Sequence, residues 1–264
     1  MSTTPDRVVV LIPTYNERES LRGVVTRVRE HVPSADVLVL DDNSPDGTGA
    51  LADDLATEDP QVRVLHRVAK EGLGKAYLAG FAWAVEQGYD AVVEMDADGS
   101  HQPEQLPRLI EASADADLVI GSRWVRGGAT HNWPHRRNAL SRGANLYVRA
   151  ALGIPVRDAT AGYRLYRTSA LRSMDLDGVA SAGYCFQVDL TLRAIDRGLR
   201  VVEVPIDFVE RTEGHSKMDG TIVREALVRV SQWGARRRAA QVSRATRDLG
   251  RRMGAGAKWH ELTD

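Results

Sequence analysis

The stretch AVVEMDAD, residues 91–98, decides how the rest of the chain is interpreted. Its mostly apolar part, residues 91–95, predicts a buried strand, and Asp96 and Asp98 close that strand at its carboxyl end. Because alternate residues of a strand point to the same side, we expect two carboxylates aimed the same way. Two such acids repel each other unless a cation lies between them. A hard divalent ion, Mg²⁺ or Mn²⁺, with phosphate oxygens in its shell meets that need.

An isolated pair of aspartates is more often a solvated turn, so its meaning depends on the surrounding pattern. Apolar segments predict strands at residues 8–12, 37–40, 62–65, 91–95 and 118–120. Amphipathic segments between them predict helices at residues 17–30, 47–56, 74–87 and 103–112. Most strand segments are β-branched and do not alternate, which indicates burial on both faces. The pattern predicts an α/β fold, a doubly wound and mostly parallel sheet with helices on both faces.

The second half of the chain is less regular. Short strands are expected at residues 163–166 and 201–204, and helices at residues 136–151, 184–197 and 221–240. The 264 residues suffice for one large α/β domain, which we place at residues 1–235. Residues 236–264 form a basic C-terminal tail, for which membrane-surface binding and disorder are both open.

Composition excludes several classes of protein. The net charge of −1 gives no steering toward nucleic acid, so no nucleic-acid partner is expected. The single cysteine, Cys185, excludes an intrachain disulfide and fits a reducing compartment. No apolar run approaches the roughly 20 residues of a membrane span, and the N-terminus lacks a signal-peptide core. We therefore expect a cytoplasmic protein that does not cross the membrane.

Three polar clusters follow predicted strands, at residues 13–17, 41–48 and 96–98. In a doubly wound sheet, ligands bind outside the carboxyl ends of the strands, so these clusters should converge on one crevice. Neither the glycine-rich fingerprint of dinucleotide dehydrogenases nor a P-loop occurs in the chain. A phosphorylated ligand would then be held by metal and by basic side chains, because guanidinium forks suit phosphate. The candidates are Arg123, Arg136, Arg137, Arg211 and Lys217.

Taken together, the ordered motifs resemble family 2 glycosyltransferases. They lie at residues 13–17, 41–48, 96–101, 121–123, 158–164 and 211–217. More narrowly they resemble the polyprenol-phosphate (dolichol-phosphate) mannose synthases, which the spacing of Arg211 and Lys217 and the segment 132–134 favour. The resemblance covers residues 7–234. It implies a GT-A type nucleotide-diphospho-sugar transferase fold.

The resemblance also implies a metal-dependent reaction. Mannose would pass from GDP-mannose to polyprenyl (dolichyl) phosphate with inversion, giving polyprenyl phosphate mannose and GDP. It assigns donor binding to Pro13, Tyr15, Glu17, Asp41, Asp42, Asp96 and Ala97, and Mg²⁺ or Mn²⁺ to Asp96 and Asp98. It assigns the acceptor phosphate to Arg123, Arg137 and Ser141, and catalysis to Asp98, Arg123, Arg211 and Lys217. Ser100 stands where some members carry a metal-binding glutamine.

Some members of this family carry C-terminal membrane spans, and this chain shows none. We expect it to reach its lipid acceptor at the cytoplasmic face, by binding the membrane surface or through a membrane-protein partner.

Three other functions stay open at this point. The same fold could use another donor such as UDP-glucose. Asp96 and Asp98 could be the acid pair of a glycoside hydrolase, although such an enzyme needs no nucleotide pocket. The chain could also be a non-catalytic module that binds nucleotide sugars, which its intact acidic and basic motifs disfavour.

Overall fold

The computed structural model describes residues 3–179, 184–210 and 227–239. The strands are β1 (Val8–Thr14), β2 (Asp36–Asp41), β3 (Val62–His66), β4 (Ala91–Glu94), β5 (Leu118–Ser122), β6 (Ala129–His131), β7 (Arg164–Arg167), β8 (Val201–Pro205) and β9 (Asp207–Val209). The α-helices are α1 (Arg18–His31), α2 (Thr48–Glu58), α3 (Leu73–Glu86), α4 (Leu106–Ala112), α5 (His135–Leu152), α6 (Thr168–Ser173) and α7 (Tyr184–Asp196). Short 3₁₀ turns, η1 (Pro103–Gln105) and η2 (Ser113–Asp115), flank α4.

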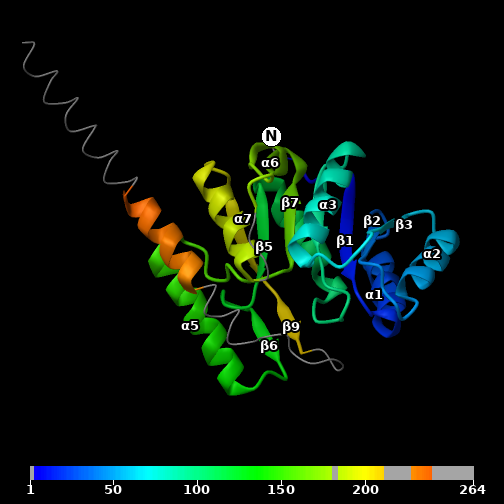
Figure 1. Cartoon of the computed structure of the whole chain (residues 1–264), viewed down its shortest axis with the longest axis horizontal. Coiled ribbons are helices and arrows are strands. Elements are labelled where there is room, and N and C mark those ends of the chain that lie inside the picture. The colour runs from blue at the N-terminus through cyan, green and yellow to red at the C-terminus, as the bar shows by residue number, and fades with distance from the viewer. Residues whose placement is uncertain (1–2, 180–183, 211–226, 240–264) are drawn as a thin grey trace, which may run out of the picture.

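Seven strands form one sheet in the order β3-β2-β1-β4-β7-β5-β8 (Figure 1). All neighbours pair in parallel except β7, which is antiparallel to both β4 and β5. The predicted doubly wound, mostly parallel sheet is therefore confirmed. A separate parallel pair, β6 with β9, lies outside this sheet. The sequence did not predict this pair, because three-residue strands leave no periodic pattern.

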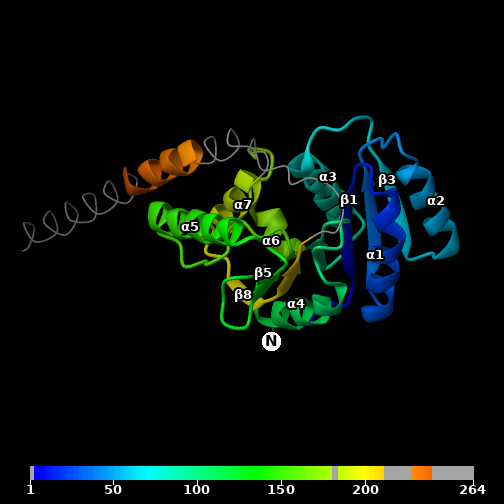
Figure 2. The same ribbon diagram turned by 90° about the horizontal axis from the view of Figure 1, so that it is seen from below.

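Helices cover both faces of the sheet, as the apolar strand segments predicted. Residues Val9 and Leu11 of β1 pack with α3, α6 and α7 on one face. Their neighbours Val10 and Ile12 pack with α1, α2 and α4 on the other face. Figure 2 shows this layering, with α3 and α7 on one side and α4 on the other. Successive residues of one strand thus belong to two cores, which explains the unbroken apolar runs.

Residues 227–239 form a helix that lies beside α5 in both views (Figures 1 and 2). The side chains of Tyr147 and Ser231 are hydrogen-bonded at 2.6 Å, and Arg238 donates to the carbonyl of Ala150 at 3.3 Å. The domain end that we expected at residue 235 falls inside this helix. Residues 240–264 of the expected tail lie outside the described residues.

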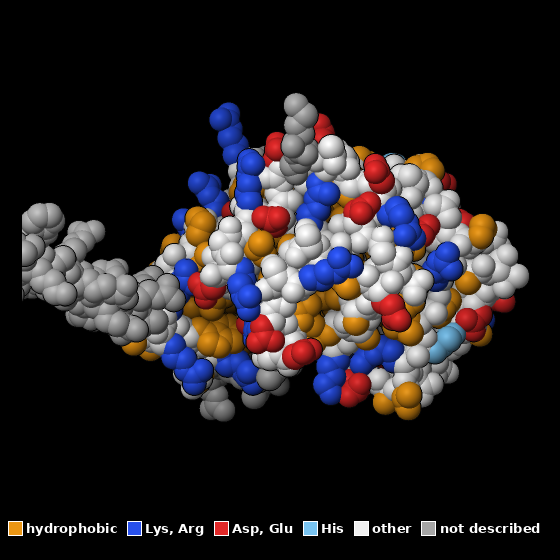
Figure 3. Space-filling model, turned by 90° about the horizontal axis from the view of Figure 1, so that it is seen from above, with side chains coloured by type: hydrophobic (Ala, Val, Ile, Leu, Met, Phe, Trp, Pro, Cys, Tyr) orange, Lys and Arg blue, Asp and Glu red, His pale blue; other side chains and the backbone are white. Residues whose placement is uncertain are grey.

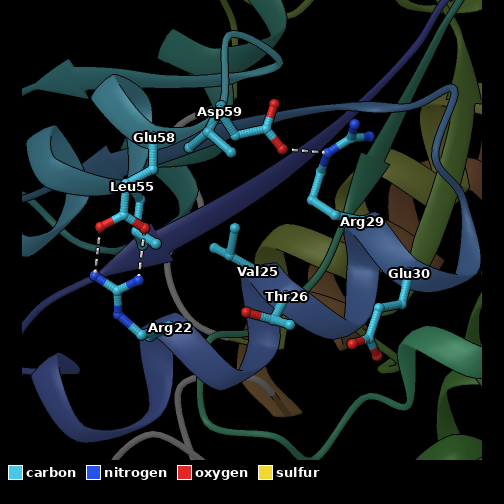
Figure 4. A pocket seen from close by; sticks show the side chains of 9 residues that line it. Arg22, Val25, Thr26, Arg29, Glu30, Leu55, Glu58 and Asp59 are labelled. Carbon is cyan, nitrogen blue, oxygen red and sulfur yellow. Dashed lines mark hydrogen bonds and ion pairs between the residues drawn. The ribbon is translucent and has the colours of Figure 1, made fainter.

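A cavity of about 320 Å³ lies between α1 and α2 near the start of β3 (Figure 4). Arg22 pairs with Glu58 at 2.7 Å, and Arg29 pairs with Asp59 at 2.8 Å. Val62, the first residue of β3, lines this cavity. The cavity therefore lies at the amino end of β3, opposite the carboxyl ends of the strands. The charged side chains that line the cavity are paired with one another, so we do not assign the cavity to the candidate site.

Two ionisable residues are buried in the middle of the sheet, where Glu94 of β4 lies opposite Arg164 of β7. Neither residue is exposed to solvent. Gln187 donates a 2.9 Å hydrogen bond to one carboxylate oxygen of Glu94, and the other oxygen has no hydrogen-bond partner. Burial raises the pKa of Glu94 to about 8, although the charge of Arg164 opposes the shift.

We predict that Glu94→Gln makes the stability of the protein less dependent on pH. The unfolded chain releases this proton above its ordinary pKa of 4.5, whereas the folded protein holds it up to about pH 8. The stabilising contribution is therefore complete below pH 4.5 and is lost as pH rises toward 8. Melting temperatures measured between about pH 5 and about pH 8 should fall in the parent protein relative to the variant, by at least about 3 °C. Parallel melting curves across that range would contradict the assignment.

Candidate functional site

Asp96 and Asp98 do not lie on a strand. β4 ends at Glu94, and both aspartates lie in the turn that follows. Strand alternation is therefore the wrong reason for their orientation. The turn is held instead by Asp98, which accepts the backbone N–H of Ser100 at 3.0 Å, and by Gly99, whose φ of 74° is left-handed.

His101 supports the same turn through a hydrogen bond. Its Nδ1 accepts the backbone N–H of Asp96 at 3.0 Å, and its ring stacks on Tyr163 with centroids 4.8 Å apart. Burial lowers the pKa of His101, against the pull of Asp96 and Asp98, so the neutral imidazole is favoured. Tyr77 of α3 donates to Asp96 at 3.5 Å. We predicted no role for Tyr77, and named His101 only as part of the motif at residues 96–101, since neither spacing nor periodicity marks a buried ring that orients a turn.

The acidic turn suits a hard cation. Its two carboxylates are partly exposed, the side chain of Asp96 by 35%, and oxygen is the donor that Mg²⁺ and Mn²⁺ prefer. Within the described ranges there is no group of three or more acidic, histidine or cysteine side chains placed to hold a metal. The donor set therefore fits an ion that takes few protein ligands and completes its shell with water and substrate phosphate, as Mg²⁺ does.

The clusters after β1 and β2 lie together, as predicted. Thr14 and Asp41 are partners in the β1–β2 register, and the Thr14 hydroxyl donates to Asp41 at 3.2 Å. Ser44 donates to the same carboxylate at 2.6 Å and accepts the backbone N–H of Asn16 at 3.2 Å. The backbone N–H of Glu17 is bound by Thr48 at 3.0 Å. The two loops are therefore one pre-formed wall at the strand carboxyl ends.

Basic side chains that the sequence did not single out line this wall. Arg67 pairs with the buried Asp42, and the Nζ of Lys70 lies 3.6 Å from the ring centroid of Tyr15. Burial raises the pKa of Asp42, while Arg67 acts in the opposite direction. Both basic residues follow β3, which shows that three strand ends contribute here. Pro13 is partly buried and Ala97 is buried.

Arg123 lies at the end of β5 in a buried ion pair. Its Nε and Nη2 donate to the two carboxylate oxygens of Asp158 at 2.8 and 2.7 Å. Asp158 is held in turn, because Glu203 of β8 accepts its backbone N–H at 2.9 Å. The guanidinium of Arg123 is thereby oriented before any ligand arrives.

Two of the predicted acceptor residues, Arg123 and Arg137, are brought together around Trp133. The guanidinium carbons of Arg123 and Arg137 lie 5.4 and 4.1 Å from the centroids of its rings, a cation–π arrangement. Arg137 also donates to Glu210 at 2.6 Å, and Ser141 follows one turn later on α5. Arg211 and Lys217 lie outside the described residues, so their predicted roles stay predictions.

Phe208 of β9 connects the acidic turn with the arginine cluster. Its ring centroid lies 5.5 Å from that of His101, and the Arg123 guanidinium lies 5.4 Å from the Phe208 ring. The arrangement therefore places a carboxylate turn suited to a cation beside guanidinium groups suited to phosphate, next to a polar wall at the ends of β1 and β2.

Among the described helices, none combines the length and the apolar character that crossing a bilayer requires.

Comparison with known proteins identifies the family of this chain. The sequence model described as glycosyl transferase family 2 matches residues 9–174. An undecaprenyl-phosphate mannosyltransferase of Micrococcus luteus is 60% identical over 228 residues, which are 86% of this chain and 94% of that protein. A polyprenol monophosphomannose synthase of Mycolicibacterium smegmatis is 58% identical over 234 residues, 88% of each chain.

More distant proteins share the fold. A dolichol-phosphate mannosyltransferase of Pyrococcus furiosus is 35% identical over 86% of this chain and 64% of its own length. The crystal structure of glucosyl-3-phosphoglycerate synthase from Mycobacterium tuberculosis, in complex with Mn²⁺, UDP-glucose and phosphoglyceric acid, superposes with a TM-score of 0.66. It covers 87% of this chain and 80% of that one at 21% identity, a likeness of fold alone. The chain therefore belongs to glycosyl transferase family 2, as one of its polyprenol-phosphate mannose synthases.

Proposed function

We propose that this protein transfers mannose from GDP-mannose to polyprenyl phosphate with inversion at the anomeric carbon, while bound peripherally at the cytoplasmic face of a membrane. The names of its relatives support mannosyl transfer to a polyprenyl phosphate. The observation that carries the proposal is the position of Phe208, which joins the acidic turn to Arg123. A cation-bound diphosphate and an acceptor phosphate could then lie side by side.

The wall formed by the loops after β1 and β2 would bind the guanosine of the donor. Asp41 is fixed by Thr14 and Ser44, so it is pre-oriented to accept hydrogen bonds. A divalent ion held by Asp96 and Asp98 would supply positive charge that offsets the charge on the departing GDP. His101 and Tyr77 keep Asp96 in place, so little reorganisation is needed during the reaction.

The arginine cluster would position the acceptor phosphate. Arg123 is held by Asp158, and Arg137 lies over Trp133, so both guanidinium groups are placed before the acceptor binds. A phosphate monoester is largely a dianion near neutral pH, because its second pKa is about 6. Its oxygen can attack without a catalytic base, and orientation is the main requirement. A single displacement would convert the α-linked mannose of the donor to a β-linked product.

We predict that Asp98→Ala lowers turnover at least about 100-fold, because the variant removes one carboxylate that would hold the cation. Its melting temperature should stay close to that of the parent protein, since Asp98 lies in a surface turn. Transfer of radiolabelled mannose to polyprenyl phosphate measures the loss. Asp54→Ala, which removes an exposed acid from α2, is the matched control and should keep full activity. Undiminished turnover in Asp98→Ala would contradict the proposed role.

We predict that Arg137→Gln raises the KM for the acceptor by about tenfold or more, because a charge-assisted contact to phosphate is lost. The affinity for GDP should not change. Steady-state kinetics with a short, water-soluble prenyl phosphate and titration calorimetry with GDP measure the two effects. Arg197→Gln, at an exposed position just after α7, is the control. An equal effect of both variants on this KM would show that only general charge matters.

The choice of donor can be tested directly. We expect transfer from GDP-mannose and little from UDP-glucose in the presence of Mn²⁺, with a β-anomeric product identified by nuclear magnetic resonance. Preference for UDP-glucose would support the alternative donor. Hydrolysis of glycosides, or donor binding without transfer, would instead support the hydrolase or the non-catalytic module.

A further inference from the structure

Asn145 is a polar residue on the buried side of α5 to which the proposed function gives no role. α5 lies at the end of the molecule away from α1 and α2 (Figures 1 and 2), and basic side chains project into solvent from that end (Figure 3). Asn145 does not share that exposure, because only 2% of its surface is accessible. Arg137, Ser141 and Asn145 recur every four residues, so they lie along one side of the helix.

The amide nitrogen of Asn145 connects α5 to the loop that holds Arg123. Its Nδ2 donates to the Thr160 hydroxyl at 3.0 Å and to one carboxylate oxygen of Asp158 at 3.4 Å. The Nη2 of Arg123 donates to the same hydroxyl at 3.2 Å and to the same carboxylate oxygen at 2.7 Å. Nδ2 also donates to the carbonyl of Ser141, one turn earlier on α5, at 3.1 Å. One amide group therefore joins α5 to the ion pair that orients Arg123.

This amide can be removed without leaving its partners unsatisfied. The Thr160 hydroxyl would still accept from Arg123 and donate to Asp158. The carbonyl of Ser141 would keep its backbone hydrogen bond within the helix. The amide oxygen of Asn145 is buried and has no hydrogen-bond partner among the described residues, which is unfavourable. The fold thus gains little from this amide, whereas the arginine cluster gains a fixed geometry.

We propose that Asn145 is a positioning residue for the acceptor phosphate, which sets the place of Arg137 and Ser141 relative to Arg123. A phosphate that contacts side chains from two elements needs those elements at a fixed separation, because charge-assisted hydrogen bonds depend on distance and direction. Asn145 acts through the arginines and does not touch the phosphate, since its side chain is buried and its amide hydrogens are already donated. The inference rests on the proposed function, which assigns the acceptor phosphate to this cluster.

The test is titration calorimetry with the full chain, using a short, water-soluble prenyl phosphate in one experiment and GDP with Mn²⁺ in another. Asn145→Leu keeps the approximate size of the side chain and removes the amide. It should raise the Kd for prenyl phosphate at least about tenfold and lower kcat/KM for that acceptor by a similar factor. The Kd for GDP and the melting temperature should stay close to the parental values, because no partner is left unsatisfied.

Tyr147→Phe is the matched control, since it removes a hydrogen bond between α5 and Ser231 and should leave both Kd values unchanged. Thr160→Val breaks the proposed link from the loop side. It should weaken prenyl phosphate binding in the same direction, and it decides the question if Asn145→Leu does not fold. The double variant should bind little more weakly than Thr160→Val alone, because the two substitutions remove the same link.

Measuring binding as well as transfer separates this inference from the proposed function. A parent chain that binds prenyl phosphate but transfers no mannose to it, with weaker binding in Asn145→Leu, would support the positioning role and refute the proposed function. Parental binding of prenyl phosphate in a folded Asn145→Leu or in Thr160→Val would overturn the inference. An equal loss of GDP binding, or no binding of prenyl phosphate by the parent chain, would overturn it as well.

Discussion

The imidazole of His101 accepts the backbone N–H of Asp96, stacks on Tyr163 and meets the ring of Phe208 edge-on. These contacts come from three parts of the chain that are distant in sequence. An unprotonated Nδ1 is needed to accept the N–H, and burial of the ring favours that neutral form. The position of the acidic turn relative to the arginine cluster therefore depends on one buried, uncharged ring.

Below the site, buried polar groups hold the loops that carry it. Arg164 donates to the carbonyls of Ala159 and Ala161, and so shapes the loop that contains Asp158. Asp158 in turn orients Arg123. Leaving a buried donor or acceptor unsatisfied costs about 1–3 kcal/mol, so each member of such a chain of contacts constrains the next. The phosphate-binding geometry is thus determined by residues that would not touch phosphate.

Charged side chains are distributed differently at the two ends of the molecule. Around the cavity between α1 and α2, arginines are paired with glutamate and aspartate, so those charges serve packing. α5 and residues 227–239 contain no aspartate or glutamate of their own, so Arg137 and Arg237 pair with acids of other elements, Glu210 and Asp196. The overall charge of −1 hides this difference, because it averages over both ends of the chain.

By itself, the sequence determined the class of fold, the approximate limits of the strands and helices in the first half, and the three polar clusters at the strand ends. The fold class could be predicted because burial of a strand on both faces leaves a continuous apolar run in the sequence. The convergence of the polar clusters could be predicted because the loops that follow parallel strands meet at the same end of the sheet. Only the tertiary structure decided that β7 is antiparallel, that β6 and β9 pair, and that the aspartates lie in a turn held by His101. Those features depend on contacts between residues far apart in the chain, which leave no local periodicity to detect.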